Sequence, residues 1–453
     1  MSARCGRLRW LPLALALTAC APEPPPNLIF VTFDTTRADF CSLYGFPHPT
    51  TPVLERLAAD GIVFDAAMSP STWTLPSHAS LWTGLHPSQH GAVSSLTADG
   101  EFGRPMPDSL PVLPELFARN GYQTAGFVGG PFVTRGFGFA RGFETYDDRI
   151  DSWGTDAATL NARIAEWLSA RRDARPLFLF VNYYDPHRPY APPADLEDPF
   201  GAPERCRERL PRDFDPASSG TLAGPVDVEC ARMQYAREIR AADRALGALL
   251  DLLERRGDLR HAVIAVTGDH GEAFGENGAW THGGAGLLHQ SHVPLVLAGL
   301  GSARLPKRRV AVGVSATRLP RTLVELAGLP APASWLGPSL LAASDADPPP
   351  LTEQFTREAF YYALHFPGWT WLWIEPRDGA AGEQLFRSRA GEPESFVREK
   401  DRPAEVVAQA QAAWQELRAR LGPTPRFSER PPTLSPAVRD SLRELGYTKS
   451  DRR

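Results

Sequence analysis

Short apolar runs alternate along this chain with longer stretches in which apolar residues recur every three or four positions. The runs are rich in β-branched and aromatic residues and predict buried strands, which we place at residues 27–33, 124–128, 177–183, 261–268 and 293–298. The periodic stretches predict helices at residues 53–60, 156–170, 233–256 and 319–327. Strands that alternate with helices are typical of an α/β fold, so we expect a mostly parallel sheet with helices on both faces.

The pattern changes after a proline-rich break at residues 342–350. Residues 360–374 are dense in aromatic side chains, residues 403–421 read as an amphipathic helix, and residues 435–446 read as a short final helix. These features predict a small α+β C-terminal subdomain. We therefore divide the chain into a signal peptide at 1–20, a proline-rich tether at 21–26, a catalytic domain at 27–345, and a C-terminal subdomain with tail at 346–453.

Two of the predicted strands end in polar clusters. Asp34 follows the strand at 27–33, and Asp269-His270 follows the strand at 261–268. In open α/β sheets, ligands bind outside the carboxyl ends of the strands. Carboxylates and imidazoles that converge there can hold a divalent cation. The sequence therefore predicts a metal-dependent enzyme.

A hydroxyl lies at the predicted start of another helix. Pro76 suits the first turn of a helix that runs to Thr83, which places Thr74 at or beside its N-terminus. Free backbone N–H groups and the helix dipole favour an oxyanion at that end, so Thr74 is a candidate nucleophile. The alternative is that Thr74 only caps the helix.

Further polar residues that could belong to the site lie after the strand at 177–183 and after Asp269-His270. Asp185 and His187 come directly after the strand, and His282 lies a short loop beyond His270. An ordinary turn is the alternative interpretation of Asp185-Pro186-His187. The number of polar clusters at strand ends favours a shared site.

Charge and the N-terminal residues change the picture in two ways. The net charge is −5 and no basic stripe stands out, which argues against a nucleic-acid partner.

Three arginines precede the short apolar stretch 10–17, which is followed by Cys20. This arrangement resembles a bacterial lipobox and predicts a lipid on Cys20, which would anchor the protein to a membrane of the bacterial cell envelope, facing the periplasm or the exterior. An ordinary secretory signal is the alternative.

Three more cysteines follow Cys20. Cys206 and Cys230 flank a proline-rich insert at 191–229 and could form a disulfide, which an oxidising compartment permits. Spacing alone leaves this pairing open. Cys41 is expected to be a small core residue.

Several ordered motifs extend over nearly the whole chain. They are Asn27 to Asp34, Leu43-Tyr44-Gly45, Thr51-Pro52, Thr74 to Gly84, Gly121 to Ala125, Asp185-Pro186-His187, Thr267 to Glu272 and Leu442 to Tyr447. In this order the motifs resemble the sulfatase family of the alkaline-phosphatase superfamily. The resemblance implies an alkaline-phosphatase-like α/β fold and an ester hydrolase.

The chain departs from that family at the residues that carry its chemistry. Sulfatases of the usual type read C-x-P-S-R at the nucleophile, whereas here Thr74 stands at the Cys position and His78 at the Arg position. Threonine cannot be oxidised to the aldehyde of formylglycine, so that group is not expected. Family lysines are replaced near Gly129 and at His282, and Thr35 stands where the family has a second aspartate.

Two cations would give these departures a common explanation. The resemblance implies a first metal on Asp34, Asp269, His270 and Thr74, and a second metal on Asp185, His187 and His282, with one metal as the alternative. The ligand types suit Zn²⁺, with Mn²⁺ or Ca²⁺ as alternatives. We expect Thr74, His78, His187 and His282 to be the catalytic residues.

The expected reaction is cleavage of a phosphate or sulfate ester through a covalent Thr74 intermediate, with phosphate monoesters or diesters favoured. The substrate is expected to be a small-molecule, glycan or lipid ester. The alternatives are a sulfuric ester hydrolase without formylglycine, a transferase of phospho groups, and a lipid-anchored protein without activity that binds anionic glycans. The oligomeric state is left open.

Overall fold

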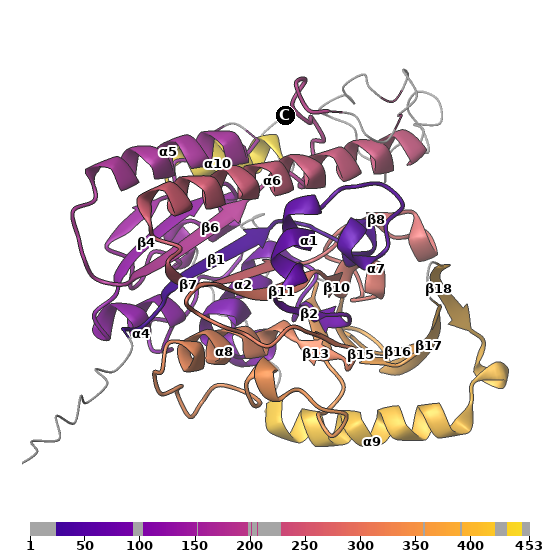
Figure 1. Ribbon diagram of the computed structural model, residues 1–453. Coiled ribbons are helices and arrows are strands. Elements are labelled where there is room, and N and C mark those ends of the chain that lie inside the picture. The colour runs from indigo at the N-terminus through magenta and orange to yellow at the C-terminus, as the bar shows by residue number, and fades with distance from the viewer. Residues whose placement is uncertain are drawn as a thin grey trace, which may run out of the picture.

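A central sheet and a smaller C-terminal sheet form the framework of the protein in the computed structural model (Figure 1). The structure describes residues 24–93, 103–151, 153–197, 201, 206, 228–356, 358–389, 392–421 and 433–445. The predicted signal peptide with Cys20, most of the insert predicted at 191–229, and Gly446-Tyr447 of the last motif lie outside the described residues.

The central sheet has eight strands in the order β12-β2-β11-β7-β1-β6-β4-β5. Their bounds are β1 Asn27–Phe33, β2 Ile62–Phe64, β4 Gln123–Val128, β5 Thr145–Asp147, β6 Leu177–Tyr183, β7 His261–Gly268, β11 Leu295–Gly301 and β12 Arg308–Val310. All neighbouring strands run parallel except that β11 is antiparallel to both β2 and β7. The expected mostly parallel α/β sheet is confirmed.

Helices cover both faces of this sheet (Figure 1). They are α1 Pro52–Ala59, α2 Thr74–Thr83, α3 Pro87–His90, α4 Leu113–Arg119, α5 Ala157–Ala170, α6 Val228–Arg256, α7 Leu288–Ser291, α8 Leu319–Leu326, α9 Ala404–Leu421 and α10 Pro436–Glu444. Side chains alternate across a strand, so β1 supplies two cores. Leu28 and Phe30 pack with α2, α4 and α8, whereas Ile29 and Val31 face α1, α5 and α6.

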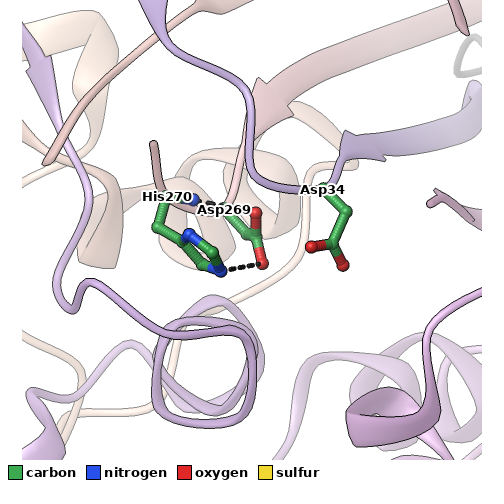
Figure 2. A group of neighbouring side chains, drawn as sticks. All are labelled: Asp34, Asp269 and His270. Carbon is green, nitrogen blue, oxygen red and sulfur yellow. Dashed lines mark hydrogen bonds and ion pairs between the residues drawn. The ribbon is translucent and has the colours of Figure 1, made fainter. Parts of the chain in front are cut away.

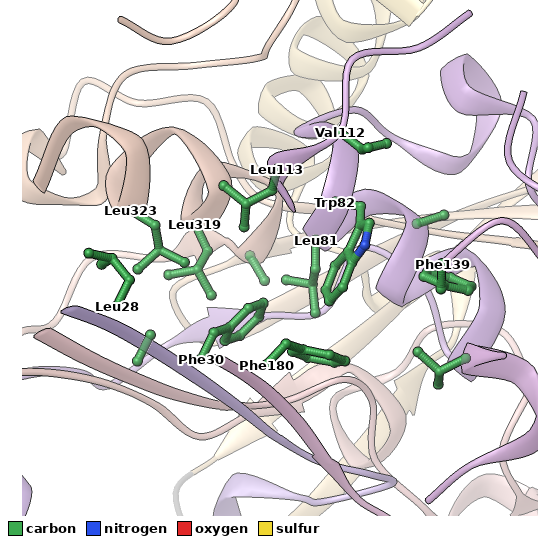
Figure 3. Close-up of a cluster of buried hydrophobic side chains, with 14 of the residues drawn as sticks. Leu28, Phe30, Leu81, Trp82, Val112, Leu113, Phe139, Phe180, Leu319 and Leu323 are labelled. Carbon is green, nitrogen blue, oxygen red and sulfur yellow. The ribbon is translucent and has the colours of Figure 1, made fainter. Parts of the chain in front are cut away.

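The first of these cores holds α2 against the sheet (Figure 3). Trp82 lies edge-on to Phe180 of β6, with ring centroids 4.4 Å apart, and Leu81 contributes to the same cluster. The helix ends at Gly84, whose φ of 62° lies in the left-handed region that glycine tolerates. Because α2 is buried along its whole length, its first residue has a fixed position relative to β1 and β6.

The C-terminal part forms an antiparallel sheet of five strands in chain order. These are β14 Leu351–Phe355, β15 Ala359–Phe366, β16 Trp369–Pro376, β17 Gly382–Arg389 and β18 Glu392–Val397. Helix α9 packs on this sheet through Trp414 and Leu417, so the expected C-terminal α+β subdomain is present. The last helix, α10, returns to the main domain, where Val438 and Leu442 join the core around α2.

Smaller pairings complete the fold. β8 Ala273–Phe274 pairs with β9 Trp280–Thr281, and β3 Ala67–Met68 lies between β10 His292–Val293 and β13 Val314–Ser315. A disulfide joins Cys206 to Cys230, as the sequence allowed, and Cys41 is a buried free cysteine. Among the described helices, none has the length and hydropathy needed to cross a bilayer.

Candidate metal and active site

Asp34, Asp269 and His270 converge at the carboxyl ends of β1 and β7 (Figure 2). The two strands pair in parallel with Phe33 opposite Gly268, so the next residues, Asp34 and Asp269, leave the sheet side by side. One ligand atom from each of the three residues lies within 4.8 Å of the others, and all three side chains are buried. Within the part of the chain that the structure describes, these three residues form the group whose carboxylate and imidazole atoms are close enough to bind one cation together.

The two oxygen atoms of the Asp269 carboxylate differ in their hydrogen bonds. Asp269 Oδ1 accepts hydrogen bonds from the backbone N–H groups of Thr35 and His270, both at 2.8 Å. Asp269 Oδ2 is buried and has no hydrogen-bond partner. A buried carboxylate oxygen without a donor is costly unless a cation satisfies it.

Burial also changes the proton affinity of these groups. It raises the pKa of Asp34 to about 8, with a further contribution from the neighbouring Asp269. It raises the pKa of Asp269 to about 7. Two adjacent carboxyl groups that resist ionisation in a closed site are ready to exchange their protons for a divalent cation.

His270 presents one ring nitrogen to the site. Its Nδ1 donates to the carbonyl of Gly271 at 2.9 Å, which leaves Nε2 with a free electron pair. This Nε2 lies 3.1 Å from Thr74 Oγ1 and 3.5 Å from Asp269 Oδ2. A backbone hydrogen bond that fixes the tautomer is a regular feature of metal-binding histidines.

Thr74 is the first residue of α2, which confirms its expected place at a helix N-terminus. Its side chain does not cap the helix and points to His270 instead. Pro76 has no N–H group and the Ser77 N–H donates to the carbonyl of Trp73 at 3.1 Å, so the N–H groups of Thr74 and Leu75 are the ones that could face an anion beside the hydroxyl. The arrangement combines a hydroxyl, a cation-binding group and an anion-binding helix end.

His78 lies one turn further along α2, with its Nδ1 3.4 Å from Asp269 Oδ2, but it is not a cation. Its Nδ1 donates to the carbonyl of Thr74 at 3.0 Å, and its Nε2 lies 3.1 Å from Thr32 Oγ1, from which it accepts. Burial lowers the pKa of His78 to about 3, so the ring is neutral. The structure gives it contacts that position Thr74, whereas the sequence placed it where the family has a charged arginine.

Asn182 is a site residue that sequence reasoning missed. Its Nδ2 donates to Thr32 Oγ1 at 3.1 Å and to Asp34 Oδ2 at 3.3 Å. Together with His78, it completes a buried chain of hydrogen bonds from the Thr74 backbone to the Asp34 carboxylate. The signal in the sequence is a lone amide in the apolar run of β6.

His187 and His282 lie next to His270 and extend the site. The rings of His282 and His270 have centroids 4.8 Å apart, and those of His187 and His282 are 5.1 Å apart. Burial lowers the pKa of both His187 and His282 well below its ordinary value. Glu272, which sequence reasoning did not assign to the site, lies with Oε1 3.4 Å from His282 Nδ1.

Asp185 is not brought to the other candidate ligands. Its Oδ2 accepts a hydrogen bond from the backbone N–H of Ala157 at 2.9 Å, at the start of α5. The described group of cation ligands is Asp34, Asp269 and His270, and it includes neither Asp185 nor His187 and His282, the other expected ligands of a second metal. Of the two residues that follow β6, His187 therefore lies at the site, whereas Asp185 accepts a hydrogen bond from the first turn of α5, where a carboxylate is a suitable acceptor. A second metal held through Asp185 gains no support from this geometry.

A cavity of about 500 Å³ lies beside His187. Its wall includes Trp153, Tyr184, Asp185 and Arg244. The cavity gives room for a substrate group next to one of the site imidazoles.

Known proteins resemble this chain in sequence and in fold. A sequence model of the family described as Sulfatase matches residues 26–329. A sulfatase of Formosa agariphila is 26% identical over 366 residues, which cover 68% of this chain and 70% of that protein. A solved structure in complex with D-glucosamine-2-N,6-O-disulfate has a TM-score of 0.71 at 17% identity and covers 90% of this chain and 100% of that one.

A phosphonate monoester hydrolase of Silicibacter pomeroyi has a similar fold, with a TM-score of 0.68 at 21% identity, covering 87% of this chain and 95% of that one. The family model covers more than half of the chain and includes Asp34, Thr74, Asp269 and His270. The resemblance inferred from the motifs is thereby confirmed, and with it the α/β fold of this superfamily. The chain belongs to the sulfatase family, the ester hydrolases of the alkaline-phosphatase superfamily.

Proposed function

We propose that this protein is a metal-dependent hydrolase that transfers the phosphoryl or sulfuryl group of an ester to Thr74 Oγ1 and then releases it to water. The observation that carries the proposal is the position of the Thr74 hydroxyl, 3.1 Å from His270 Nε2 at the start of α2. Among the described residues, the Thr74 hydroxyl is the one that combines a helix N-terminus with the cation-binding group.

The residues present fit a divalent cation. The cation would be held by two carboxylate oxygens and one imidazole nitrogen, from Asp34, Asp269 and His270. Asp269 Oδ2 is a suitable ligand atom because it is buried and has no hydrogen-bond partner. When bound, such a cation stabilises negative charge on oxygen and lowers the pKa of a nearby hydroxyl. The mixed nitrogen and oxygen donors suit zinc, and manganese is the nearest alternative.

In the first step, Thr74 Oγ1 forms a bond to phosphorus or sulfur while the bond from that atom to the ester oxygen breaks. The hydroxyl proton passes to solvent and the departing alkoxide takes up a proton, so the step needs no oxidant or reductant. The N–H groups of Thr74 and Leu75 would bind the anionic oxygens of the transferred group. His78 and Asn182 hold the Thr74 turn against Asp34 while this occurs.

In the second step, water attacks the same phosphorus or sulfur and the Thr74 oxygen leaves. His187 and His282 lie beside His270, with ring centroids 5.1 and 4.8 Å along the series, and their imidazoles would orient that water. The cavity beside His187 would receive the rest of the substrate.

We further propose that phosphate esters are preferred to sulfate esters. The hydrated aldehyde of formylglycine can release a bound group by collapse to the aldehyde, but threonine has no second oxygen on Cβ. Release from Thr74 must occur by attack on phosphorus or sulfur. Fold similarity to a phosphonate monoester hydrolase is compatible with this preference, and sequence similarity to sulfatases favours the alternative of sulfate ester cleavage.

The test is a substrate panel on metal-loaded protein. 4-Nitrophenyl phosphate, its diester, a 4-nitrophenyl phosphonate and 4-nitrophenyl sulfate are compared for the wild type, Thr74→Ala and Thr74→Ser. We expect turnover of at least one phosphorus ester, a loss of about 10³-fold or more in Thr74→Ala, and partial retention in Thr74→Ser.

The matched control is Thr83→Ala, which removes a buried threonine hydroxyl from the other end of the same helix. It should retain activity. Full activity of Thr74→Ala would reject the nucleophile, whereas turnover of the sulfate alone would reject the phosphate preference and leave the nucleophile in place.

A further inference from the structure

Thr35 has a backbone conformation that threonine rarely adopts. Its φ is 54°, in the left-handed region, and the residue is fully buried between Asp34 and the loop that leads away from β1. β-Branched residues are disfavoured there for steric reasons, so such a conformation persists only where the surroundings hold it. The contacts of Thr35 should therefore explain why it keeps this backbone conformation next to Asp34.

Three hydrogen bonds hold Thr35 in this conformation. Its N–H donates to Asp269 Oδ1 at 2.8 Å, and its hydroxyl donates to Asp34 Oδ1 at 2.8 Å. Its carbonyl accepts from the hydroxyl of Tyr235 at 2.6 Å. The left-handed turn therefore lets one residue donate to both carboxylates of the site.

These bonds decide which carboxylate oxygens remain for a cation. Asp269 Oδ1 receives two N–H donors and Oδ2 receives none. Asp34 Oδ1 receives the short bond from Thr35, and Oδ2 receives only the longer contact from Asn182 at 3.3 Å. Each carboxylate thus offers one oxygen, and His270 adds one nitrogen.

We propose that Thr35 is a positioning residue that sets the metal preference of the site by making both carboxylates single-oxygen ligands. Zinc accepts about four ligands in mixed nitrogen and oxygen sets. Calcium requires about six to eight oxygens and commonly binds carboxylates through both atoms. A site with two single-oxygen carboxylates and one imidazole therefore favours zinc over calcium. The Thr35 hydroxyl enforces this arrangement at Asp34, and the Thr35 N–H contributes to it at Asp269.

The inference rests on the metal dependence proposed above, and binding measurements test it without any activity assay. The dissociation constants of Zn²⁺ and Ca²⁺ are measured on metal-free protein, by competition with a chelating dye and by calorimetry. The variants are Thr35→Ser, which keeps the hydroxyl, Thr35→Ala, which removes it, and Thr35→Gly, which removes it and also relieves the left-handed backbone. Thr134→Ala, another buried threonine whose hydroxyl bonds only to a local carbonyl, is the control.

We expect Thr35→Ala and Thr35→Gly to weaken zinc binding about 10- to 100-fold, as the loss of an outer-shell partner does elsewhere. Calcium binding should not weaken in parallel, so the preference for zinc falls. Thr35→Ser and Thr134→Ala should bind both cations as the wild type does. The thermal midpoint of each metal-free variant shows that the fold is retained, and Thr35→Gly should be at least as stable as Thr35→Ala because glycine adopts this φ freely.

Unchanged constants in both Thr35→Ala and Thr35→Gly would overturn the inference and leave the metal dependence standing. Weaker zinc binding in Thr35→Ala alone would also overturn it, because the effect would then come from the backbone and not from the hydroxyl. A wild type that binds neither cation would remove the proposed metal dependence and this inference with it.

Discussion

At the scale of single residues, the site contains two carboxyl groups, those of Asp34 and Asp269, whose pKa is raised by burial. The pKa of Asp34 is about 8 in the folded protein, against 3.8 for an unburied aspartate. Between these values the folded protein holds a proton that the unfolded chain has released, so the free energy of unfolding falls as the pH rises. Buried histidines make the free energy of unfolding rise with pH, but only below about pH 6.5, where histidines of the unfolded chain are protonated. Above about pH 6.5 the effect of the carboxyl groups can therefore be measured by itself.

We therefore predict that the metal-free protein loses stability between about pH 6.5 and 8, by about 1–2 kcal/mol for Asp34. Denaturant unfolding of chelator-treated wild type and Asp34→Asn measures this loss. The variant should show a smaller decrease over the same interval, because it has no carboxyl to ionise there. Identical pH dependence of the two proteins would contradict the assignment.

The residue scale also marks the limit of prediction from sequence. Asp34, Thr74, Asp269 and His270 could be named because they follow apolar runs or begin a helix, and such positions fix a side chain through the backbone alone. Asn182 and the bonding role of Thr35 could not be named. Whether Asn182 faces Asp34 depends on the register of β6 against β1. The left-handed turn at Thr35 is held in part by bonds to Asp269 and Tyr235, which lie two hundred residues or more away along the chain.

At the scale of elements, the buried strands and long helices were predictable because their apolar patterns are continuous. β1, β6 and β7 match the predicted strands, and α5 and α8 match the predicted helices to within a residue or two. The antiparallel direction of β11 was not predictable, since a buried strand has the same composition in either direction. The orientation of Asp185 was also missed, because a carboxylate after a strand can serve either a cation or the next helix.

Several buried hydrogen bonds link the two parts of the fold, and Glu353 makes two of them. Glu353 of β14 accepts hydrogen bonds from the backbone N–H and the hydroxyl of Ser88 in α3, at 2.7 and 2.8 Å. Glu353 is fully buried, so its removal would leave the Ser88 N–H without an acceptor. This contact fixes the C-terminal sheet against the segment that follows the nucleophile helix.

We predict that Glu353→Ala destabilises the protein by about 1–3 kcal/mol, the cost of a buried donor left unpaired. Ser88→Ala should cost less, because it removes only the hydroxyl. Equilibrium unfolding of the two single variants and the double variant gives the coupling energy. A coupling of zero would show that the bond between the Ser88 hydroxyl and Glu353 contributes nothing to the junction.

At the scale of the whole molecule, two sheets and the returning helix α10 form the framework that carries the site (Figure 1). The fold class and the family could be read from the order of the motifs, which extend from β1 to the last helix. The membrane anchor remains a proposal, because Cys20 and the residues before it lie outside the described part of the chain. It is motivated by the arginines, the short apolar stretch and Cys20 in sequence.

We predict that the protein made in a bacterial host is lipidated on Cys20. Growth with an alkyne-labelled fatty acid should label the wild type and Cys41→Ala, but not Cys20→Ala. Cys20→Ala should also leave the membrane fraction, because acyl chains and not a protein helix would hold the protein there. Labelling that persists in Cys20→Ala would contradict the anchor.

The central claim is that the Thr74 hydroxyl receives the transferred group inside a cation-binding site. The most direct measurement is mass spectrometry of metal-loaded protein quenched in acid during turnover of the best substrate. We predict a phosphoryl or sulfuryl adduct on the peptide that contains Thr74, absent from Thr74→Ala and from chelator-treated protein. Sustained turnover by Thr74→Ala, with no adduct on that peptide in the wild type, would contradict it.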